Sequence, residues 1–370
     1  MKIKNKKKIF IYQRSYLNHI SNIKRIRISE NRDLIRGLRM NRNERVEDFP
    51  KDLLKKIFSR VKKYELGKYP DQTLIYKKLS RFLGVKNSKL LITSGIDGSI
   101  KTIFEVLTRP GSRIGILRPT YAMYKVYSGI FKTKIKEIGY DPSTFKLNKK
   151  NIFSFIKSSP EIIFLPNPNQ PIEDPLSIKN ITKICQLAQK YKVLVVIDEA
   201  YHMFGTASAI SLINKFKNLI ILRTFSKSFG IPSIRFGYVV ANENIINILS
   251  CYRLSYESNL LTDVVAGYFI DNIKYAKKYI FKVKKGRDYL KEELKKINIK
   301  VIGGKSNFLL INFRNKTLYN EVSKELKKNK IYVKSNYPAP LDCCILITCG
   351  PKYLMKKFLN LIIKKVKKYK

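Results

Sequence analysis

The stretch "VLVVIDEA", residues 193–200, is an almost unbroken apolar run that ends in two carboxylates. Short apolar runs of the same kind occur on both sides of it in the chain. They are "KLLITS" (89–94), "RIGILRP" (113–119), "EIIFLPN" (161–167), "LIILRTFS" (219–226) and "RFGYVVAN" (235–242). Helix-length segments separate several of these runs, a pattern typical of buried parallel strands with connecting helices. The sequence therefore predicts an α/β fold whose large domain has a mainly parallel sheet sandwiched by helices.

The pattern changes after about residue 246. A Lys-rich amphipathic stretch at 275–297 is followed by the strand-like runs "SNFLLINF" (306–313) and "CCILITCG" (343–350). A chain of 370 residues is longer than one typical domain. We therefore predict an N-terminal arm at 1–45, a large ligand-binding domain at 46–245 and a smaller α+β domain at 246–370.

The chain is strongly basic, with 75 Lys and Arg against 27 Asp and Glu and a net charge of +48. Such a charge would ordinarily suggest a nucleic acid or an anionic membrane as partner. The lysines, however, are spread along the whole chain and come with abundant Ile, Asn and Tyr, as in proteins from AT-biased genomes. We find no basic stripe with interleaved aromatic residues, so we predict no specific nucleic-acid partner, and a polyanion partner is the alternative.

Cysteine and histidine content argues against disulfides and metal sites. The cysteines are odd in number and show no CxxC or similar spacing, which favours free thiols in a reducing compartment. They are Cys185, Cys251, Cys343, Cys344 and Cys349. The chain has two histidines, the basic N-terminus is not followed by an apolar segment, and no apolar run approaches membrane-spanning length. We predict a cytoplasmic protein with no metal and no membrane contact.

Three groups of polar residues follow predicted strands, at the place where open α/β sheets bind ligands. In "TSGIDGSIKTIF" (93–104), Gly95 follows a strand, and the backbone N–H groups of Ile96 and Asp97 open a helix and can point at an anion. Taken alone, this segment is equally typical of a plain strand-to-helix turn.

The second group is "DEAY", residues 198–201. Asp198 ends a very apolar strand, where an unpaired carboxylate is costly, so it needs a cationic or N–H partner. It could also simply cap the segment that follows. Tyr201 lies three residues further on and could face the same ligand.

The third group is "TFSKSFGIPSIRFG", residues 224–237. Thr224 and Ser226 offer hydroxyl donors beside Lys227, and Arg235 offers a bidentate fork for a phosphate. A desolvated lysine next to such groups can attack carbonyl carbons, although in isolation Lys227 would be an ordinary surface lysine. Together, an anion cradle, a buried aspartate and this lysine are what pyridoxal phosphate requires for its phosphate, ring nitrogen and aldehyde.

These motifs resemble, in the same order, those of the class I/II aminotransferases, which are fold-type I pyridoxal-phosphate enzymes. Within this family the chain is most similar to the histidinol-phosphate aminotransferases, from "MNRNE" (40–44) to "ITCGP" (347–351). Residues 224–237 resemble the family's lysine motif SxSKxxGxxGxRxG. The resemblance implies that Lys227 binds the cofactor aldehyde and that Asp198 holds the ring nitrogen.

Three tyrosines receive implied roles from the same resemblance. Tyr201 of "DEAY" would lie near the cofactor's phenolic oxygen, and Tyr121 of "RPTYAMY" would stack on its ring. Tyr69 of "KYPD" would reach the phosphate of the cofactor bound by a partner subunit. The resemblance therefore implies a homodimer.

Two segments depart from the family pattern. Where the family has SPNNPTG, the chain has "NPNQPIE" (167–173), so the amide that bonds the phenolic oxygen falls at Gln170, with Asn169 just before it. Where the family has RITxGT, whose arginine clamps the substrate carboxylate, the chain has "LITCGP" with Leu346. Three explanations are open: another cation substitutes, a natural substrate lacks an α-carboxylate, or the enzyme has been repurposed. The candidate cations are Arg253, Arg39 and Lys305.

We interpret the chain as an aminotransferase that moves an amino group between a small amine or amino acid, which can carry a phosphate, and a keto acceptor. The alternative is a pyridoxal-phosphate-dependent decarboxylase of a phosphorylated hydroxy-amino acid. The two reactions share their cofactor residues and differ in which Cα bond of the substrate stands perpendicular to the ring. That orientation is set by the substrate pocket.

Overall fold

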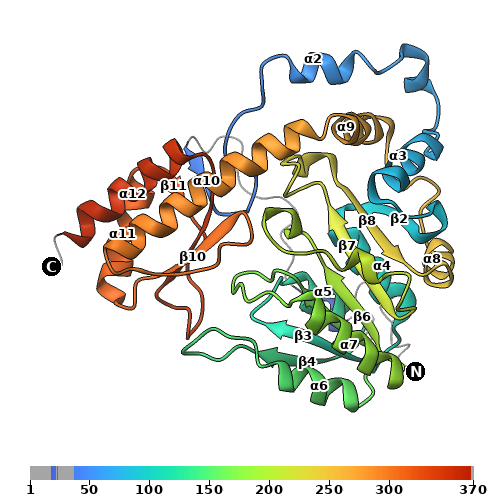
Figure 1. Ribbon diagram of the computed structural model, residues 1–370, viewed down its shortest axis with the longest axis horizontal. Coiled ribbons are helices and arrows are strands. Elements are labelled where there is room, and N and C mark those ends of the chain that lie inside the picture. The colour runs from blue at the N-terminus through green and yellow to red at the C-terminus, as the bar shows by residue number, and fades with distance from the viewer. Residues whose placement is uncertain (1–17, 22, 24–36, 368–370) are drawn as a thin grey trace, which may run out of the picture.

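The large domain is built on one seven-stranded sheet (Figure 1). The computed structural model describes residues 18–21, 23 and 37–367. The strands are β2 (Leu90–Ser94), β3 (Arg113–Arg118), β4 (Lys134–Gly139), β5 (Ile162–Pro166), β6 (Leu194–Asp198), β7 (Leu219–Thr224) and β8 (Phe236–Ala241). Their order is β2-β8-β7-β6-β5-β3-β4. The strand β8 runs in the direction opposite to the other six strands, which are parallel to one another. The prediction of a mainly parallel sheet is confirmed.

Helices cover both faces of this sheet because its buried strands present apolar side chains to both sides. Along β6, Val196 packs with one group of helices, whereas Val195 and Ile197 pack with the other. The first group is α4 (Gly95–Leu107), α5 (Met123–Ile130) and α8 (Glu243–Ser250). The second is α2 (Leu53–Phe58), α3 (Thr73–Leu83), α6 (Lys149–Lys157), α7 (Ile178–Lys190) and α9 (Leu260–Asp271).

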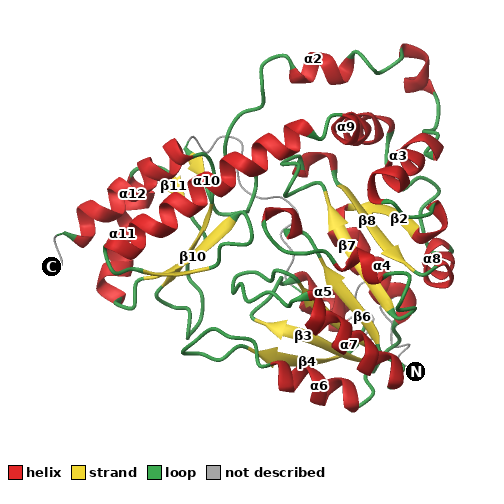
Figure 2. Ribbon diagram, in the orientation of Figure 1, coloured by secondary structure: helices red, strands yellow, loops and turns green. Residues whose placement is uncertain are grey.

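The small domain is an antiparallel sheet covered by three helices (Figure 2). Its strands are β9 (Lys300–Ile302), β10 (Phe308–Asn312) and β12 (Cys344–Thr348), in the order β12-β10-β9. The helices are α10 (Lys274–Lys296), α11 (Lys316–Lys328) and α12 (Lys352–Val366). A short parallel pair joins β1 (Leu38–Arg39) to β11 (Ile331–Tyr332), so the segment before the large domain is attached to the small one.

Short helical turns complete the described elements. They are α1 (Asn18–Ser21), η4 (Lys63–Gly67), η5 (Asn87–Lys89), η6 (His202–Phe204), η7 (Ala209–Leu212) and η8 (Pro232–Ile234). The proposed boundary at 245/246 stays a prediction, and α9, on its C-terminal side, packs Ala266 and Phe269 into the core of the large domain. Most of the predicted arm, 1–45, lies outside the described residues.

The carboxyl ends of four strands lie along one edge of the large sheet. β5, β6 and β7 are parallel, and β2 runs the same way because β8, between β2 and β7, is antiparallel to both. The segments that follow Ser94, Pro166, Asp198 and Thr224 therefore meet. The topology gathers the three predicted motifs at this edge.

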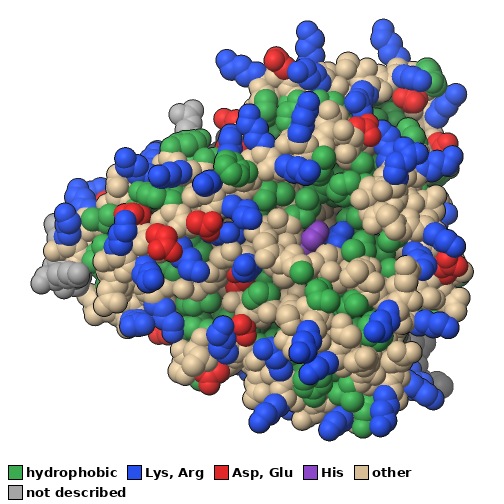
Figure 3. All heavy atoms as spheres, in the orientation of Figure 1, with side chains coloured by type: hydrophobic (Ala, Val, Ile, Leu, Met, Phe, Trp, Pro, Cys, Tyr) green, Lys and Arg blue, Asp and Glu red, His purple; other side chains and the backbone are tan. Residues whose placement is uncertain are grey.

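Lys and Arg side chains are spread over both domains on the face seen in Figure 3 and do not form a single stripe there. The prediction of no specific nucleic-acid partner stays a prediction. In residues 18–21, 23 and 37–367, no helix combines the length and apolar character needed to span a membrane. The same part of the chain contains no group of three His, Cys, Asp or Glu residues placed to hold a metal ion.

Candidate active site

Asp198 lies at the carboxyl end of β6 with 6% of its surface exposed. Its Oδ2 accepts from the Tyr124 hydroxyl at 2.8 Å, and its Oδ1 accepts from the Ala200 N–H at 3.0 Å. Burial raises the pKa of Asp198 to about 6, although both hydrogen bonds act in the opposite direction. The carboxylate caps the following turn and also remains suited to a cation or a protonated ring nitrogen.

Lys227 follows β7 and reaches back to the N-terminal segment of the chain. Its Nζ donates to the carbonyl oxygens of Arg42 and Asn43, both at 3.2 Å. The same nitrogen lies 5.9 Å from the centre of the Tyr201 ring. Lys227 and Tyr201, which are separated in the sequence by a whole strand, are therefore neighbours.

Burial also changes the pKa of Lys227. It lowers the pKa of the amine to about 8; the charge of Glu44 opposes this shift, and that of Arg235 adds to it. An amine with such a pKa is neutral for about a tenth of the time at pH 7, which suffices for nucleophilic attack on a carbonyl carbon. The same amine can take up and return a proton near neutral pH.

Asn43 connects the parts of this site and is only 1% exposed. Its Nδ2 donates to the Tyr201 hydroxyl at 2.9 Å, and its N–H donates to Thr348 Oγ1 at 2.8 Å. Its carbonyl oxygen accepts both from Lys227 and from Asn307 Nδ2, the latter at 3.1 Å. One asparagine therefore joins the large-domain lysine and tyrosine to two residues of the small domain.

The predicted anion cradle forms at the start of α4. Gly95 has φ of +69°. A Cβ on Gly95 would lie 2.6 Å from Nη2 of Arg235, and a Cβ on Gly237 would lie 2.5 Å from the carbonyl carbon of Gly95. At Gly95 the positive φ favours glycine, and at Gly237 a side chain would collide with the backbone at the start of α4. Ile96 and Asp97 occupy the first turn of α4, whose N–H groups need external acceptors.

Two hydroxyls complete the cradle at the end of β7. Thr224 Oγ1 lies 2.9 Å from Ser226 Oγ and 3.0 Å from the Phe236 carbonyl oxygen, and both hydroxyl residues are buried. Tyr121 donates to Asp97 Oδ1 at 3.2 Å and is 40% exposed, which leaves part of its ring accessible to a ligand. The cradle thus combines backbone, hydroxyl and guanidinium donors.

Three predicted cofactor residues have other surroundings in the described part of the chain. Asn169 Nδ2 donates to the Pro119 carbonyl at 2.9 Å, and its Oδ1 accepts from Thr120 at 2.7 Å. Gln170, next to it, is half-buried. Tyr69 is 80% exposed and stacks on Tyr256 at 4.7 Å. The assigned cofactor roles of Asn169, Gln170 and Tyr69 stay predictions.

Leu346 is fully buried in β12, where the family pattern has its carboxylate-binding arginine. Lys334 lies opposite it in an isolated antiparallel bridge, with N–H to O distances of 3.0 Å and 2.8 Å. Residues paired in this way present their side chains on the same face, and Thr348, two positions along, shares that face. Because Thr348 bonds Asn43, the face that carries Lys334 is the one toward the cofactor residues.

The three cations that the sequence offered in place of the arginine are placed differently. Arg253 donates to the carbonyl oxygens of Leu254 and Ser255 in its own loop. The aliphatic part of Lys305 packs over Gly205. Arg39 belongs to β1 and pairs with β11 in the sheet register.

The clustered residues fit pyridoxal phosphate. Asp198 suits the ring nitrogen, Lys227 suits the aldehyde, and the cradle around Gly95 and Arg235 suits the phosphate. The absence of side chains at Gly95 and Gly237 is the most specific sign, because it keeps the helix N-terminus and the guanidinium together. Backbone N–H groups at a helix N-terminus and a guanidinium are the donors that suit the phosphate of the cofactor.

Sequence reasoning missed Tyr124, Asn43 and Lys334. Tyr124 is the second tyrosine of "YAMY" and, one helical turn from Tyr121, meets its ring edge-on at 6.2 Å. That spacing was a usable signal, and so was the polar "MNRNE" for Asn43. Lys334 had none, because one lysine after a short apolar run does not stand out among 75 basic residues.

Asp198→Asn is expected to change how stability depends on pH in the protein without cofactor. The folded pKa of Asp198, about 6, lies above the ordinary 3.8, so the stability that its protonated form contributes is present below pH 4 and lost as pH rises through 6. The amide has no such term. Unfolding in urea should show the free-energy difference between the two proteins shift by about 1 to 3 kcal/mol, in favour of the variant, from pH 4 to pH 7. Parallel pH profiles would contradict the assignment.

Comparison with known proteins identifies the family. The sequence pattern of the family described as aminotransferase class I and II matches residues 40–362. The histidinol-phosphate aminotransferase of Thermoanaerobacter pseudethanolicus is 34% identical over 285 residues, which cover 75% of this chain and 78% of that protein. That of Christiangramia forsetii is 33% identical over 302 residues, which cover 80% and 84%.

Solved structures show the same fold. The histidinol-phosphate aminotransferase of Sinorhizobium meliloti, in complex with pyridoxal-5'-phosphate, superposes with a TM-score of 0.83 at 18% identity, covering 95% of this chain and 98% of that chain. The L-threonine-O-3-phosphate decarboxylase of Porphyromonas gingivalis superposes with a TM-score of 0.68 at 21% identity, covering 84% and 96%. With the family pattern and the cofactor cluster both present, this chain belongs to the class I and II aminotransferases and is a pyridoxal-phosphate-dependent transaminase.

Proposed function

We propose that the protein transfers an amino group between a phosphorylated amino alcohol of the histidinol-phosphate type and a keto acid. Relatives above 30% identity carry that activity in their names. The observation that supports the proposal most directly is the pairing of Lys334 with Leu346 on the face toward the site. Lys334 supplies one flexible ammonium group where the family pattern has the bidentate guanidinium of an arginine.

Lys334 is suited to a phosphate or a carboxylate. Burial lowers its pKa, and its Nζ lies 5.5 Å from the centre of the Tyr337 ring. The Tyr337 hydroxyl is buried and has no hydrogen-bond partner among the described residues. Burial raises the pKa of Tyr337, so its hydroxyl stays protonated and can donate. An ammonium and a free hydroxyl together can bind the anionic group that both substrates carry.

The remaining residues would divide the chemistry between them. Bound pyridoxal phosphate supplies an aldehyde and an electron-accepting ring. Lys227 holds and returns the proton that moves during the exchange, since its pKa of about 8 allows both states. Asp198 holds a proton at the ring-nitrogen position, and Tyr201 and Asn43 orient the groups around Lys227.

The experiment that tests this proposal supplies the enzyme loaded with cofactor with histidinol phosphate and 2-oxoglutarate. We expect glutamate and the matching phosphorylated ketone in equal amounts, identified by mass spectrometry. Carbon dioxide released from phosphothreonine, without glutamate, would instead support the decarboxylase alternative. At present the resemblance to a decarboxylase is one of fold.

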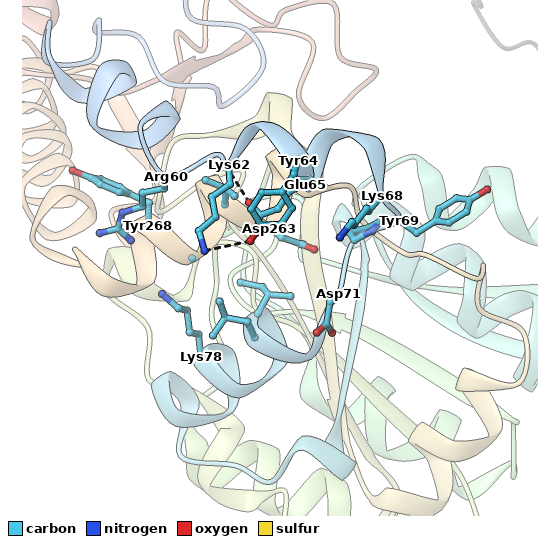
Figure 4. A pocket seen from close by; sticks show the side chains of 16 residues that line it. Arg60, Lys62, Tyr64, Glu65, Lys68, Tyr69, Asp71, Lys78, Asp263 and Tyr268 are labelled. Carbon is cyan, nitrogen blue, oxygen red and sulfur yellow. Dashed lines mark hydrogen bonds between the residues drawn. The ribbon is translucent and has the colours of Figure 1, made fainter.

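We also propose that the enzyme is a homodimer in which each subunit lends Tyr69 to its partner's site. Exposed apolar residues gather around a surface pocket of about 470 Å³ in which Tyr69 takes part (Figure 4). They are Tyr64, Tyr69 and Leu74. Such a concentration of exposed apolar area is typical of a surface that another chain covers. In Figure 4 the Tyr69 ring projects away from the other side chains that line the pocket.

Light scattering should accordingly give twice the 43.2 kDa mass of one chain. Tyr69→Ala should remain dimeric and bind pyridoxal phosphate about tenfold more weakly, since a lost hydrogen bond to a charged group is worth about 1.5 kcal/mol or more. When Tyr69→Ala and Lys227→Ala subunits are mixed and allowed to exchange, one site of each hybrid dimer contains both intact residues. At a pyridoxal-phosphate concentration too low to load Tyr69→Ala alone, activity should return in the mixture, and its failure to return would show that Tyr69 does not act across the interface.

The state of the cysteines bears on the cellular compartment in which the protein acts. All five cysteines are unpaired in the structure. We infer a reducing compartment, and propose the cytoplasm as the site of action.

A further inference from the structure

Glu173 is a buried carboxylate in the segment that departs from the family pattern. "NPNQPIE" (167–173) ends in Glu173 where that pattern ends in glycine. The side chain is 8% exposed and crosses from the large domain to the turn between β9 and β10. Its Oε2 accepts from the Lys305 N–H at 2.6 Å, and its Oε1 accepts from the Ser306 hydroxyl. Burial raises the pKa of Glu173, and the hydrogen bonds from this turn oppose that shift.

The same turn is held from its other side by Arg287 of α10, which is 3% exposed. Its Nη1 donates to the Ser306 carbonyl at 2.9 Å and to the Phe204 carbonyl at 3.3 Å. Ser306 is fully buried. Glu173 therefore bonds the hydroxyl of Ser306 while Arg287 bonds its carbonyl oxygen, and two buried charged groups hold the position of this small-domain residue.

Asn307, the residue after Ser306, is connected to Lys227 by hydrogen bonds through Asn43. Asn307 Nδ2 donates to the carbonyl oxygen of Asn43 at 3.1 Å. That oxygen also accepts from Lys227 Nζ at 3.2 Å, and Asn43 Nδ2 donates to the Tyr201 hydroxyl at 2.9 Å. A continuous path of hydrogen bonds and one peptide link thus runs from Glu173 to both groups that face the reacting atoms.

We propose that Glu173 is a positioning residue for transamination: by anchoring Ser306, it holds Asn307 and Asn43 where they orient Lys227 and Tyr201. The inference rests on the transaminase function stated above. Removing the carboxylate takes the acceptor from the Lys305 N–H and leaves the buried Ser306 hydroxyl only the Phe308 carbonyl oxygen, at 3.4 Å, so we expect the turn to move. Displacements of about 1 Å at groups that hold a reacting amine lower rates by about 10- to 100-fold.

The test compares Glu173→Ala with Asp174→Ala, both loaded with cofactor. Asp174 is a matched control because it also accepts a backbone N–H, that of Leu147 at 2.8 Å, but bonds only within the large domain. We expect kcat per bound cofactor to fall about tenfold in Glu173→Ala, with a smaller change in KM, and to stay near wild type in Asp174→Ala. Glu173→Gln keeps one acceptor and should recover part of the rate. It also serves if the alanine variant does not fold.

Two further measurements need no substrate. The rate at which added pyridoxal phosphate attaches to Lys227, followed by visible absorbance, should fall about tenfold in Glu173→Ala. Amide hydrogen exchange at 304–307, in protein without cofactor, should become faster in the same variant. Faster exchange with unchanged attachment and unchanged kcat would overturn the proposal, since Glu173 would then only stabilise the fold. If wild type attaches cofactor but transfers no amino group, the proposed function fails, and the attachment rates still decide the role of Glu173.

Discussion

Lys227→Ala should abolish turnover while leaving the fold largely intact. Lys227 is the amine that lies beside Tyr201 and the carbonyl oxygens of Arg42 and Asn43, and a lowered pKa makes it reactive. Alanine removes the covalent attachment of the cofactor and the group that moves the proton, so no residual route remains. The visible absorbance of the attached cofactor should disappear, and kcat should fall below the limit of detection. Circular dichroism should remain near that of wild type.

Borohydride reduction of the wild type, followed by peptide mapping, identifies the attached lysine independently. We expect the pyridoxyl group on the peptide that contains residues 224–237. Lys190→Ala is the control, since Lys190 is an exposed lysine at the end of α7 and should leave both labelling and kcat near wild type. A label on any other lysine would overturn the assignment of Lys227.

Lys334→Ala should produce the second largest effect, a fall in kcat/KM of about one to two orders of magnitude for both the phosphorylated amine and the keto acid. A charged hydrogen-bonded contact in a desolvated site contributes about 1.5 to 3 kcal/mol, and each 1.4 kcal/mol is a factor of ten. The fall should appear mainly in KM if Lys334 holds the anionic group equally in the ground state and the transition state. Lys324→Ala, an exposed lysine of α11, is the control.

Moving the cation to the opposite strand sharpens this test. Leu346 and Lys334 share one face, so Lys334→Ala combined with Leu346→Arg places a guanidinium beside the space that the lysine leaves. We expect the double variant to recover binding of α-carboxylate substrates by about tenfold or more over Lys334→Ala, because arginine bonds a carboxylate bidentately. Leu346→Arg alone should gain less, since two cations would then repel each other. If Lys334→Ala leaves both KM values unchanged, another residue is the clamp, and Arg253→Ala, Arg39→Ala and Lys305→Ala should be compared next.

Much of the fold could be predicted from the sequence because its central strands are buried on both faces. The apolar runs at 89–94, 113–119, 161–167, 193–200, 219–226 and 235–242 all contain strands of the large sheet. The strand that this reasoning missed is β4, which lies at the edge and reads "KIKEIG". Its outward Lys134 and Lys136 are exposed, so its apolar signal alternates and is weak.

Some residues of the candidate site could also be predicted from the sequence, and others could not. Asp198, Thr224 and Gly95 could be found because each ends or directly follows a parallel strand, and such ends must meet at one edge. The polar segment around Asn43 could be noticed, but its contacts could not be predicted, since its partners Lys227 and Thr348 lie 184 and 305 residues away in the sequence. Spacing carries no information about contacts over such distances.

By itself, the sequence determined the class of fold and the cofactor, and it predicts Lys227 as the lysine that binds the cofactor, because strand ends, glycine positions and the motif around that lysine follow from local pattern and elementary chemistry. Only the tertiary structure decided which groups contact that lysine and which cation we propose for the substrate. Asn43 and Glu173 make contacts between separate parts of the chain, and Lys334 pairs with Leu346 across the small domain. Such contacts depend on how separately specified elements pack against each other, and no short stretch of residues encodes that packing.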